Sequence, residues 1–266
     1  MIIEIRAKNC FAFEEEISFS MKADMRNKKF ASNVHRENNF NVLKTAGVYG
    51  PNNVGKTCLV KCIRAIKNVL LDKESGLLRN IFSNNEVCQL GVTFLSLGRK
   101  FSYDFWYNAK TREYVYESFT EILKDQYGNE KEVLWLKRDT IKEEYFCIDE
   151  DAQKMMPIIS KNNLFCYLVD TTKFESLKEM KNILVGFAEK IDIINMNNIP
   201  MKHTIELLKN KNNLQEKIVE FIKNADLYMD DFKYVDGDKI QVDASDEAGK
   251  PEEKALDIPE NIMDQI

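Results

Sequence analysis

Hydrophobic and polar residues alternate along much of the first half of the chain, with the two-residue period of β-strands. Alternating runs, and one unbroken apolar run, predict strands at residues 1–6, 17–21, 45–49, 87–95, 100–107, 114–119 and 132–136. The turn between two of these strands contains Gly98, so the pair around it forms a predicted β-hairpin. From residue 87 onward the strands predict an antiparallel meander.

In other parts of the chain, apolar residues recur every three or four positions, which predicts helices. These helices cover residues 57–71, 162–169, 173–194 and 204–225. A short strand is predicted at 232–235. Residues 236–257 are acidic and hold few apolar side chains, so they predict a solvated loop or disorder.

The sequence GPNNVGKT at residues 50–57 lies between a predicted strand and a predicted helix, and it fits the phosphate-loop pattern G-x-x-x-x-G-K-[ST]. In such a loop, backbone N–H groups and the positive end of the following helix face phosphate. Lys56 is expected to reach the β- and γ-phosphates, and Thr57 to hold Mg²⁺. An ordinary glycine turn is the alternative. The predicted nucleotide contacts are Gly50, Pro51, Asn52, Asn53, Val54, Gly55, Lys56, Thr57 and Cys58.

Composition narrows the class of protein. Hydrophobic residues make up 44% of the 266 residues, which is enough for a substantial core, and charged residues make up 30%. No apolar stretch is long enough to span a membrane. The six cysteines are scattered without a C-x-x-C pair, and the N-terminus does not resemble a signal peptide, so a cytoplasmic protein with reduced thiols is expected.

The net charge of −5 is unevenly distributed. Residues 226–266 carry 13 acidic residues against 4 lysines, a local charge of −9, which leaves about +4 for the rest of the chain. This is not the basic footprint of a nucleic-acid-binding protein, so charge gives no support to DNA binding.

Taken in order, these pieces resemble the N-terminal part of an ABC-type AAA-family ATPase, related to RecF-like and SMC-like proteins. The segments that carry the resemblance are residues 5–13 (IRAKNCFAF), 46–57 (AGVYGPNNVGKT), the hairpin at 91–107 with Tyr116-Glu117, Asn163-Leu164-Phe165 and 221–227. The resemblance implies an α/β fold: a P-loop NTPase core of ABC type with an antiparallel β lateral sheet and a helical subdomain.

The same resemblance implies a domain organisation. An N-terminal lobe would span residues 1–235, and residues 236–266 would form an acidic loop or tail that leads to a C-terminal lobe. Within the N-terminal lobe, the P-loop core would cover residues 1–86, the meander 87–150 and the helical subdomain 151–225.

Family members form a homodimer around ATP and Mg²⁺. They complete hydrolysis with a Ser-x-Gly signature helix, a strand ending Asp-Glu and a switch histidine, which are expected beyond Ile266. Gln89 is a candidate for the glutamine that such folds direct at Mg²⁺ and the attacking water. The resemblance also implies a prokaryotic role in anti-phage defence or DNA repair, with an effector nuclease or toxin as partner.

Several residues imitate the expected catalytic motifs. Asp149-Glu150 follows an apolar run as a catalytic pair would, but charged residues flank that run. The sequence at 95–99 (LSLGR) imitates a signature, although a hairpin turn fits better. Asp170 is expected at a helix end or in a loop, and His35 and His203 on the surface.

Two functions therefore stay open. The first is an ATP-binding module of an ATPase that is inactive alone. The second is a non-catalytic, nucleotide-gated sensor or interaction module. The sequence lacks the guanine-reading Asn-Lys-x-Asp motif but does not otherwise distinguish ATP from GTP.

Overall fold

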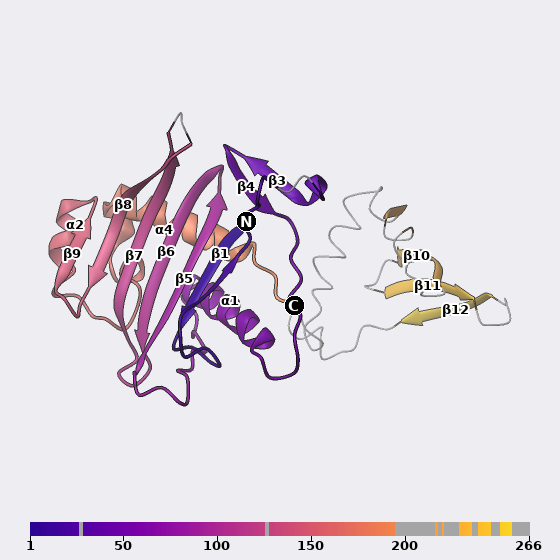
Figure 1. Cartoon of the computed structure of the whole chain (residues 1–266), viewed down its shortest axis with the longest axis horizontal. Coiled ribbons are helices and arrows are strands. Elements are labelled where there is room, and N and C mark those ends of the chain that lie inside the picture. The colour runs from indigo at the N-terminus through magenta and orange to yellow at the C-terminus, as the bar shows by residue number, and fades with distance from the viewer. Residues whose placement is uncertain are drawn as a thin grey trace. The chain divides into compact units, whose positions relative to one another are not determined.

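The computed structural model describes residues 1–26, 29–125, 128–194, 216–217, 220, 229–235, 239–245 and 251–256. The chain divides into two compact units, Met1–Ile193 and Ile194–Ile266 (Figure 1). The phosphate loop and the candidate residues Gln89, Asp149 and Glu150 belong to the first unit.

A seven-stranded sheet forms the first unit, in the order β2-β1-β5-β6-β7-β8-β9, and every neighbouring pair is antiparallel. The strands are β1 (Ile2–Lys8), β2 (Ile17–Ser20), β5 (Val87–Ser96), β6 (Arg99–Asn108), β7 (Glu113–Lys124), β8 (Glu130–Asp139) and β9 (Glu144–Cys147). From β5 to β9 each strand pairs with the next one along the chain, as local hairpins require. The antiparallel meander predicted from residue 87 onward is confirmed.

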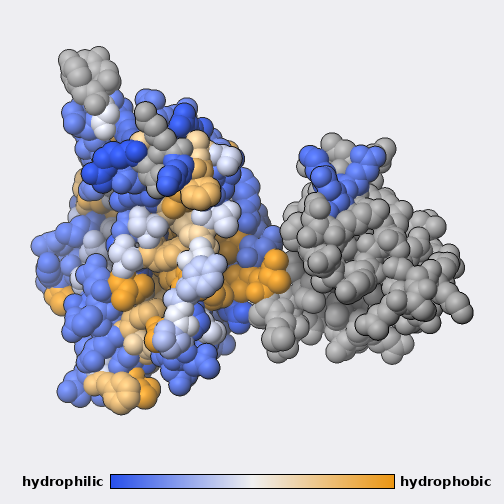
Figure 2. Space-filling model, turned by 45° about the vertical axis from the view of Figure 1, so that its right-hand side comes forward, coloured by the Kyte–Doolittle hydropathy of each residue, from blue (hydrophilic) through white to orange (hydrophobic). Residues whose placement is uncertain are grey.

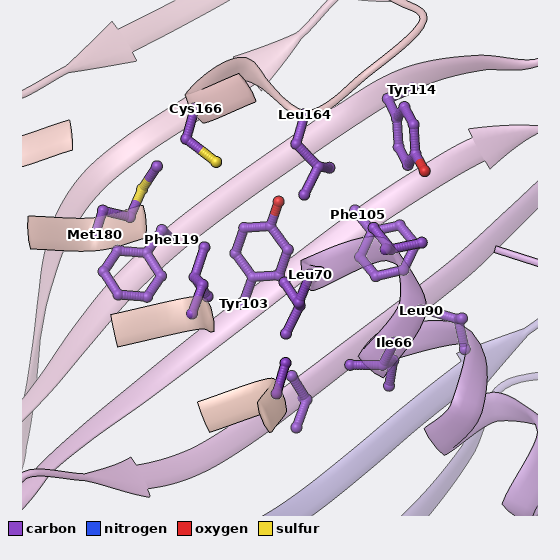
Figure 3. Close-up of a cluster of buried hydrophobic side chains, with 14 of the residues drawn as sticks. Ile66, Leu70, Leu90, Tyr103, Phe105, Tyr114, Phe119, Leu164, Cys166 and Met180 are labelled. Atoms are coloured by element: carbon purple, nitrogen blue, oxygen red, sulfur yellow. The ribbon is translucent and has the colours of Figure 1, made fainter. Parts of the chain in front are cut away.

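Helices cover one face of this sheet. Helix α1 (Lys56–Leu70) and helix α4 (Glu175–Glu189) contribute buried side chains to a single apolar core with the strands. Phe187 of α4 stacks on Phe94 of β5 with ring centroids 4.0 Å apart. The short helices α2 (Glu150–Met155) and α3 (Phe165–Leu168) supply further core residues. Figure 3 shows one of them, Cys166 of α3, among the buried side chains.

Polar side chains occupy the opposite face of the sheet. Arg6 on β1 reaches across β5 and bonds Asp104 on β6 at 2.9 Å, and it also bonds the hydroxyls of Thr93 and Ser102. Gly91 lies beneath this ion pair, because a side-chain carbon there would come within 2.0 Å of the Asp104 carboxylate. The sheet therefore has an apolar face that carries the helices and a polar face.

A buried ion pair ties β7 and β8 to the segment before α3. Glu117 and Arg138 are both fully buried, and their charged groups are 3.2 Å apart. Glu117 also accepts hydrogen bonds from the Tyr103 hydroxyl and the Phe165 N–H, both at 2.9 Å. Arg138 donates to the carbonyl of Asn163 at 2.8 Å. These bonds hold Asn163–Phe165 on the sheet.

The remaining elements are small. A hairpin of β3 (Val34–Glu37) and β4 (Phe40–Leu43) packs Phe40 and Val42 against Ile3 and Leu95. Two 3₁₀ turns, η1 and η2, cover Ala31–Asn33 and Thr171–Lys173. In the second unit, β10 (Met229–Val235), β11 (Lys239–Ser245) and β12 (Pro251–Leu256) form an antiparallel sheet.

The predicted α/β fold, a P-loop NTPase core of ABC type, is wrong for this structure. The described part of the chain is mainly antiparallel sheet with four α-helices, and no parallel strand pair occurs in it. The expected central strand at 45–49 is not a strand, and all five of its residues are exposed. An apolar strand becomes buried only between neighbours, and no described strand pairs with this one.

Other predictions had mixed outcomes. The helix predicted at 57–71 and the strand predicted at 232–235 are confirmed as α1 and β10. The predicted loop at 236–257 is wrong for β11 and β12, because Ile240, Val242 and Ala244 alternate with polar residues despite the acidic composition. The helix predicted at 204–225 lies almost entirely outside the described residues.

The predicted subdivisions of the N-terminal lobe share one core. Strand β1, from the predicted P-loop region, pairs with β5 of the predicted meander. Helix α4, from the predicted helical subdomain, packs on that same sheet.

Candidate functional site

The phosphate loop connects an extended stretch after β4 to the first turn of α1 (Figure 1). Gly55 precedes the helix with a φ of 94°, a left-handed conformation that favours glycine. Asn53 is also left-handed, with a φ of 66°. Backbone in which right-handed and left-handed residues alternate points successive N–H groups to one side, which makes an anion-binding concavity.

The donors of this loop are free within the described structure. No described group accepts a hydrogen bond from the backbone N–H of Asn52, Asn53 or Val54, and all three residues are exposed. The first turn of α1 contains no acidic residue, so nothing there offsets the positive end of the helix. These donors suit a phosphate group, so the residues of the loop fit the nucleotide that the motif predicts.

The Lys56 side chain turns back into the loop. Its ammonium group donates a 2.7 Å hydrogen bond to the Gly50 carbonyl and a second one to the Pro51 carbonyl. The loop thus already holds the lysine charge close to its own backbone. Thr57, the candidate magnesium ligand, is exposed in the first turn of α1, and Cys58 is half-buried beside it.

The turn after β1 supports the loop. The Phe13 ring lies so close to Gly55 that a side-chain carbon on Gly55 would come within 2.9 Å of it. Cys10 and Phe13 bond each other's backbone in this turn, and the Lys61 ammonium of α1 lies 5.8 Å from the centre of the Phe11 ring. The resemblance included this turn, but its contact with Gly55 has no signal in the sequence, because the two segments are far apart along the chain.

Gly55→Ala tests this contact. The substitution adds the cost of a left-handed alanine, about 1–2 kcal/mol, to the clash with Phe13. Gly76→Ala is the matched control, since Gly76 also has a positive φ but nothing within 4 Å of its added carbon. Urea unfolding is expected to show a larger stability loss for Gly55→Ala. Equal losses would mean that the Phe13 contact does not constrain the loop.

Gln89 lies on β5, with its side chain on the polar face of the sheet. It lines a cavity of about 280 Å³ together with Arg6, Lys8 and Trp106 on the polar face of the sheet. Its neighbours Cys88 and Leu90 point into the core that α1 shares, so Gln89 faces the other way. The described structure therefore does not bring Gln89 to Thr57.

The residues that resemble the expected catalytic motifs lie at the ends of helices or in turns. Asp149 precedes α2 and Glu150 begins it, after β9, which lies at the opposite end of the sheet from β1 and β2. The turn at Leu97–Gly98 joins β5 to β6, so the predicted hairpin turn is confirmed. Asp170 accepts a hydrogen bond from the Thr172 N–H in a 3₁₀ turn, as expected of a helix-end residue.

The histidines and cysteines that the structure describes do not form a second candidate site. His35 is on β3, 3.2 Å from Glu37, and His203 lies outside the described residues. All six cysteines are free and five are buried; burial raises the pKa of Cys62 to about 12, so its thiol stays protonated. Among the described residues, no cluster of three His, Cys, Asp or Glu side chains could hold a metal ion.

Several large apolar side chains within the loop or near it in sequence are exposed. Tyr49 is 93% exposed, and Val48, Val54 and Val60 are also exposed. Figure 2 shows apolar surface among polar residues on the face of the first unit that it turns toward the viewer. The loop is thus an open, donor-rich backbone site with exposed apolar residues next to it in sequence.

Comparison with known proteins adds no family assignment. No protein-family model matches the sequence, and no curated protein matches it. No helix among the described residues is long and apolar enough to cross a membrane.

Proposed function

We propose that the chain binds Mg-ATP through Gly50–Thr57. The observation that carries this proposal is the loop itself. The motif leads into the first turn of α1, the N–H groups of Asn52–Val54 are unused by any described group, and the Lys56 side chain is held inside the loop. Lys56 would exchange its two carbonyl partners for phosphate oxygens. Thr57 would hold Mg²⁺, which supplies charge neutralisation on the phosphates.

Binding is better supported than hydrolysis. Phosphoryl transfer to water needs a carboxylate or amide that orients the water beside the γ-phosphate. Asp149-Glu150 is at the far edge of the sheet and Gln89 is on its polar face. In this proposal, groups outside the described residues, or from a second subunit around the nucleotide, complete the reaction. The defence or repair role and the effector partner rest on the resemblance alone.

A competition experiment tests nucleotide binding. A fluorescent ATP analogue is titrated with the full chain in Mg²⁺, and then displaced with ATP, GTP, ADP or AMP. We expect ATP and ADP to displace it and AMP to fail, because the loop recognises the β- and γ-phosphates. Chelation of Mg²⁺ should weaken binding. An absence of saturable binding, or equal displacement by AMP, would refute the proposed site.

The division between binding and hydrolysis has its own test. Phosphate release from ATP by the purified chain should stay at background. A robust rate that disappears in the Lys56→Ala variant would show that the chain carries its own catalytic groups.

A further inference from the structure

The turn after α1 presents apolar side chains to solvent on a fixed backbone. Ile81 is 80% exposed, Phe82 78% and Leu78 65%. Asn80, which is only 3% exposed, fixes this turn: its amide donates to the Phe11 carbonyl at 3.0 Å, and its side-chain oxygen accepts from the Phe82 N–H at 2.9 Å. The apolar tip Ile81–Phe82 is therefore preorganised, which lowers the entropic cost of burying it against a partner.

A cavity adjoins this tip. It has a volume of about 920 Å³, and Leu78 and Ile81 form part of its wall. Ala109, Tyr107 and Tyr114 line it from the sheet side. The ring of Tyr114 packs against the ring of Phe105, and their centroids are 6.0 Å apart. Figure 3 shows both rings among the buried side chains of the first unit. The cavity is large enough for a bulky side chain, and Phe82 is not among the residues that line it.

The charges around the cavity have both signs. Lys73, Arg79 and Arg112 line it together with Asp72 and Glu74. Arg79 already pairs with Glu86 at 3.1 Å, and Asp72 accepts a hydrogen bond from Asn163. A nucleic acid or a strongly charged protein would meet like charges there, and this argues against both. A two-fold interface pairs a surface with its own copy, so it needs both cations and acids on the same surface, and this one has both.

We propose that this surface mediates a two-fold homodimer in which Phe82 of each chain enters the cavity of the other, while Ile81 stays in the wall of its own cavity. A projecting apolar tip beside a receptive cavity is self-complementary under two-fold symmetry, as an isologous interface requires. Contiguous exposed apolar groups mark interaction surfaces, and Leu78, Ile81 and Phe82 are exposed within five positions of the chain.

This dimer is separate from the one expected around ATP. The cavity begins at Asp72, just past the C-terminus of α1, whereas the phosphate loop precedes its N-terminus. A 15-residue helix is about 22 Å long, so the two places are at opposite ends of it. The proposal does not rest on nucleotide binding.

Sedimentation velocity of the full chain over a concentration series, without nucleotide, tests the proposal. We expect a reversible dimer. Phe82→Glu should raise its dissociation constant at least about tenfold, the effect of losing an interface hot spot. Ala109→Trp should do the same by filling the cavity while it leaves the tip intact. Ile158→Glu is the matched control, since Ile158 is 85% exposed and lies outside the cavity lining.

The outcomes are distinct. A chain that stays monomeric at every concentration, or a dimer that tolerates both Phe82→Glu and Ala109→Trp, overturns the proposal. Circular dichroism confirms that the variants are folded, and Phe82→Glu alone decides if Ala109→Trp does not fold. Dimerisation of Lys56→Ala separates this surface from the nucleotide site, because that variant should keep the dimer while it loses ATP.

Discussion

Lys56→Ala is expected to weaken ATP binding by about tenfold to a hundredfold. A charge-assisted hydrogen bond contributes about 1.5–3 kcal/mol, and each 1.4 kcal/mol is a factor of ten in affinity. In the structure the Lys56 ammonium group is held by the Gly50 and Pro51 carbonyls, so it already lies inside the loop where phosphate would bind. On binding, the ammonium group would exchange these two carbonyl hydrogen bonds for bonds to phosphate oxygens.

Lys61→Ala is the matched control for this prediction. Lys61 is an exposed lysine on the same helix, close to the Phe11 ring, and its removal changes the net charge equally. Displacement titrations should show nearly unchanged ATP affinity for Lys61→Ala. If both variants lost affinity to the same degree, the cause would be general electrostatic attraction, and the assignment of Lys56 to the phosphates would be wrong.

Local signals predicted the parts of the fold that depend on local sequence. Helix α1 has an apolar face at helical spacing and a glycine before it, so the predicted range 57–71 agrees with Lys56–Leu70. The β5–β6 hairpin combines alternation with Leu97 and Gly98 in left-handed conformations at the turn. In both elements the residues that determine the structure are neighbours in sequence.

The errors arose where distant partners decide the structure. The run at 45–49 is apolar enough for a buried strand, but a strand needs hydrogen-bonded neighbours, and none of the described strands supplies them. The side of the sheet on which Gln89 lies could be predicted from the sequence. Gln89 lies between the apolar residues Cys88 and Leu90 on one strand, so its side chain is on the face away from the core. The resemblance suggested a catalytic role that this periodicity does not favour.

The sequence did not predict that residues 160–165 are held on the sheet, because the ion pair that holds them forms only in the folded protein. Glu117 and Arg138 are on adjacent strands and pair in register. Each looks like an ordinary surface charge within an alternating strand. Only the packing of α3 and its preceding loop over these strands buries them, at 0% exposure for both.

Removing one member of this pair is expected to give the largest stability loss in the first unit. Arg138→Met leaves the Glu117 carboxylate buried without its cation, which costs about 3–5 kcal/mol for a pair of this kind. It also leaves the Asn163 carbonyl without the 2.8 Å hydrogen bond from Arg138. Urea unfolding followed by circular dichroism measures the loss as a lower midpoint at constant slope.

The double variant Glu117→Gln/Arg138→Met separates charge from packing. The amide that replaces the carboxylate keeps an oxygen that can accept from the Tyr103 hydroxyl or the Phe165 N–H but carries no charge, so part of the stability should return. Lys137→Met is the matched control, because Lys137 is on the same strand and its ion pair with Glu144 is exposed to solvent. That variant should leave the midpoint nearly unchanged. If Arg138→Met behaved like Lys137→Met, the buried pair would not be what holds residues 160–165 on the sheet.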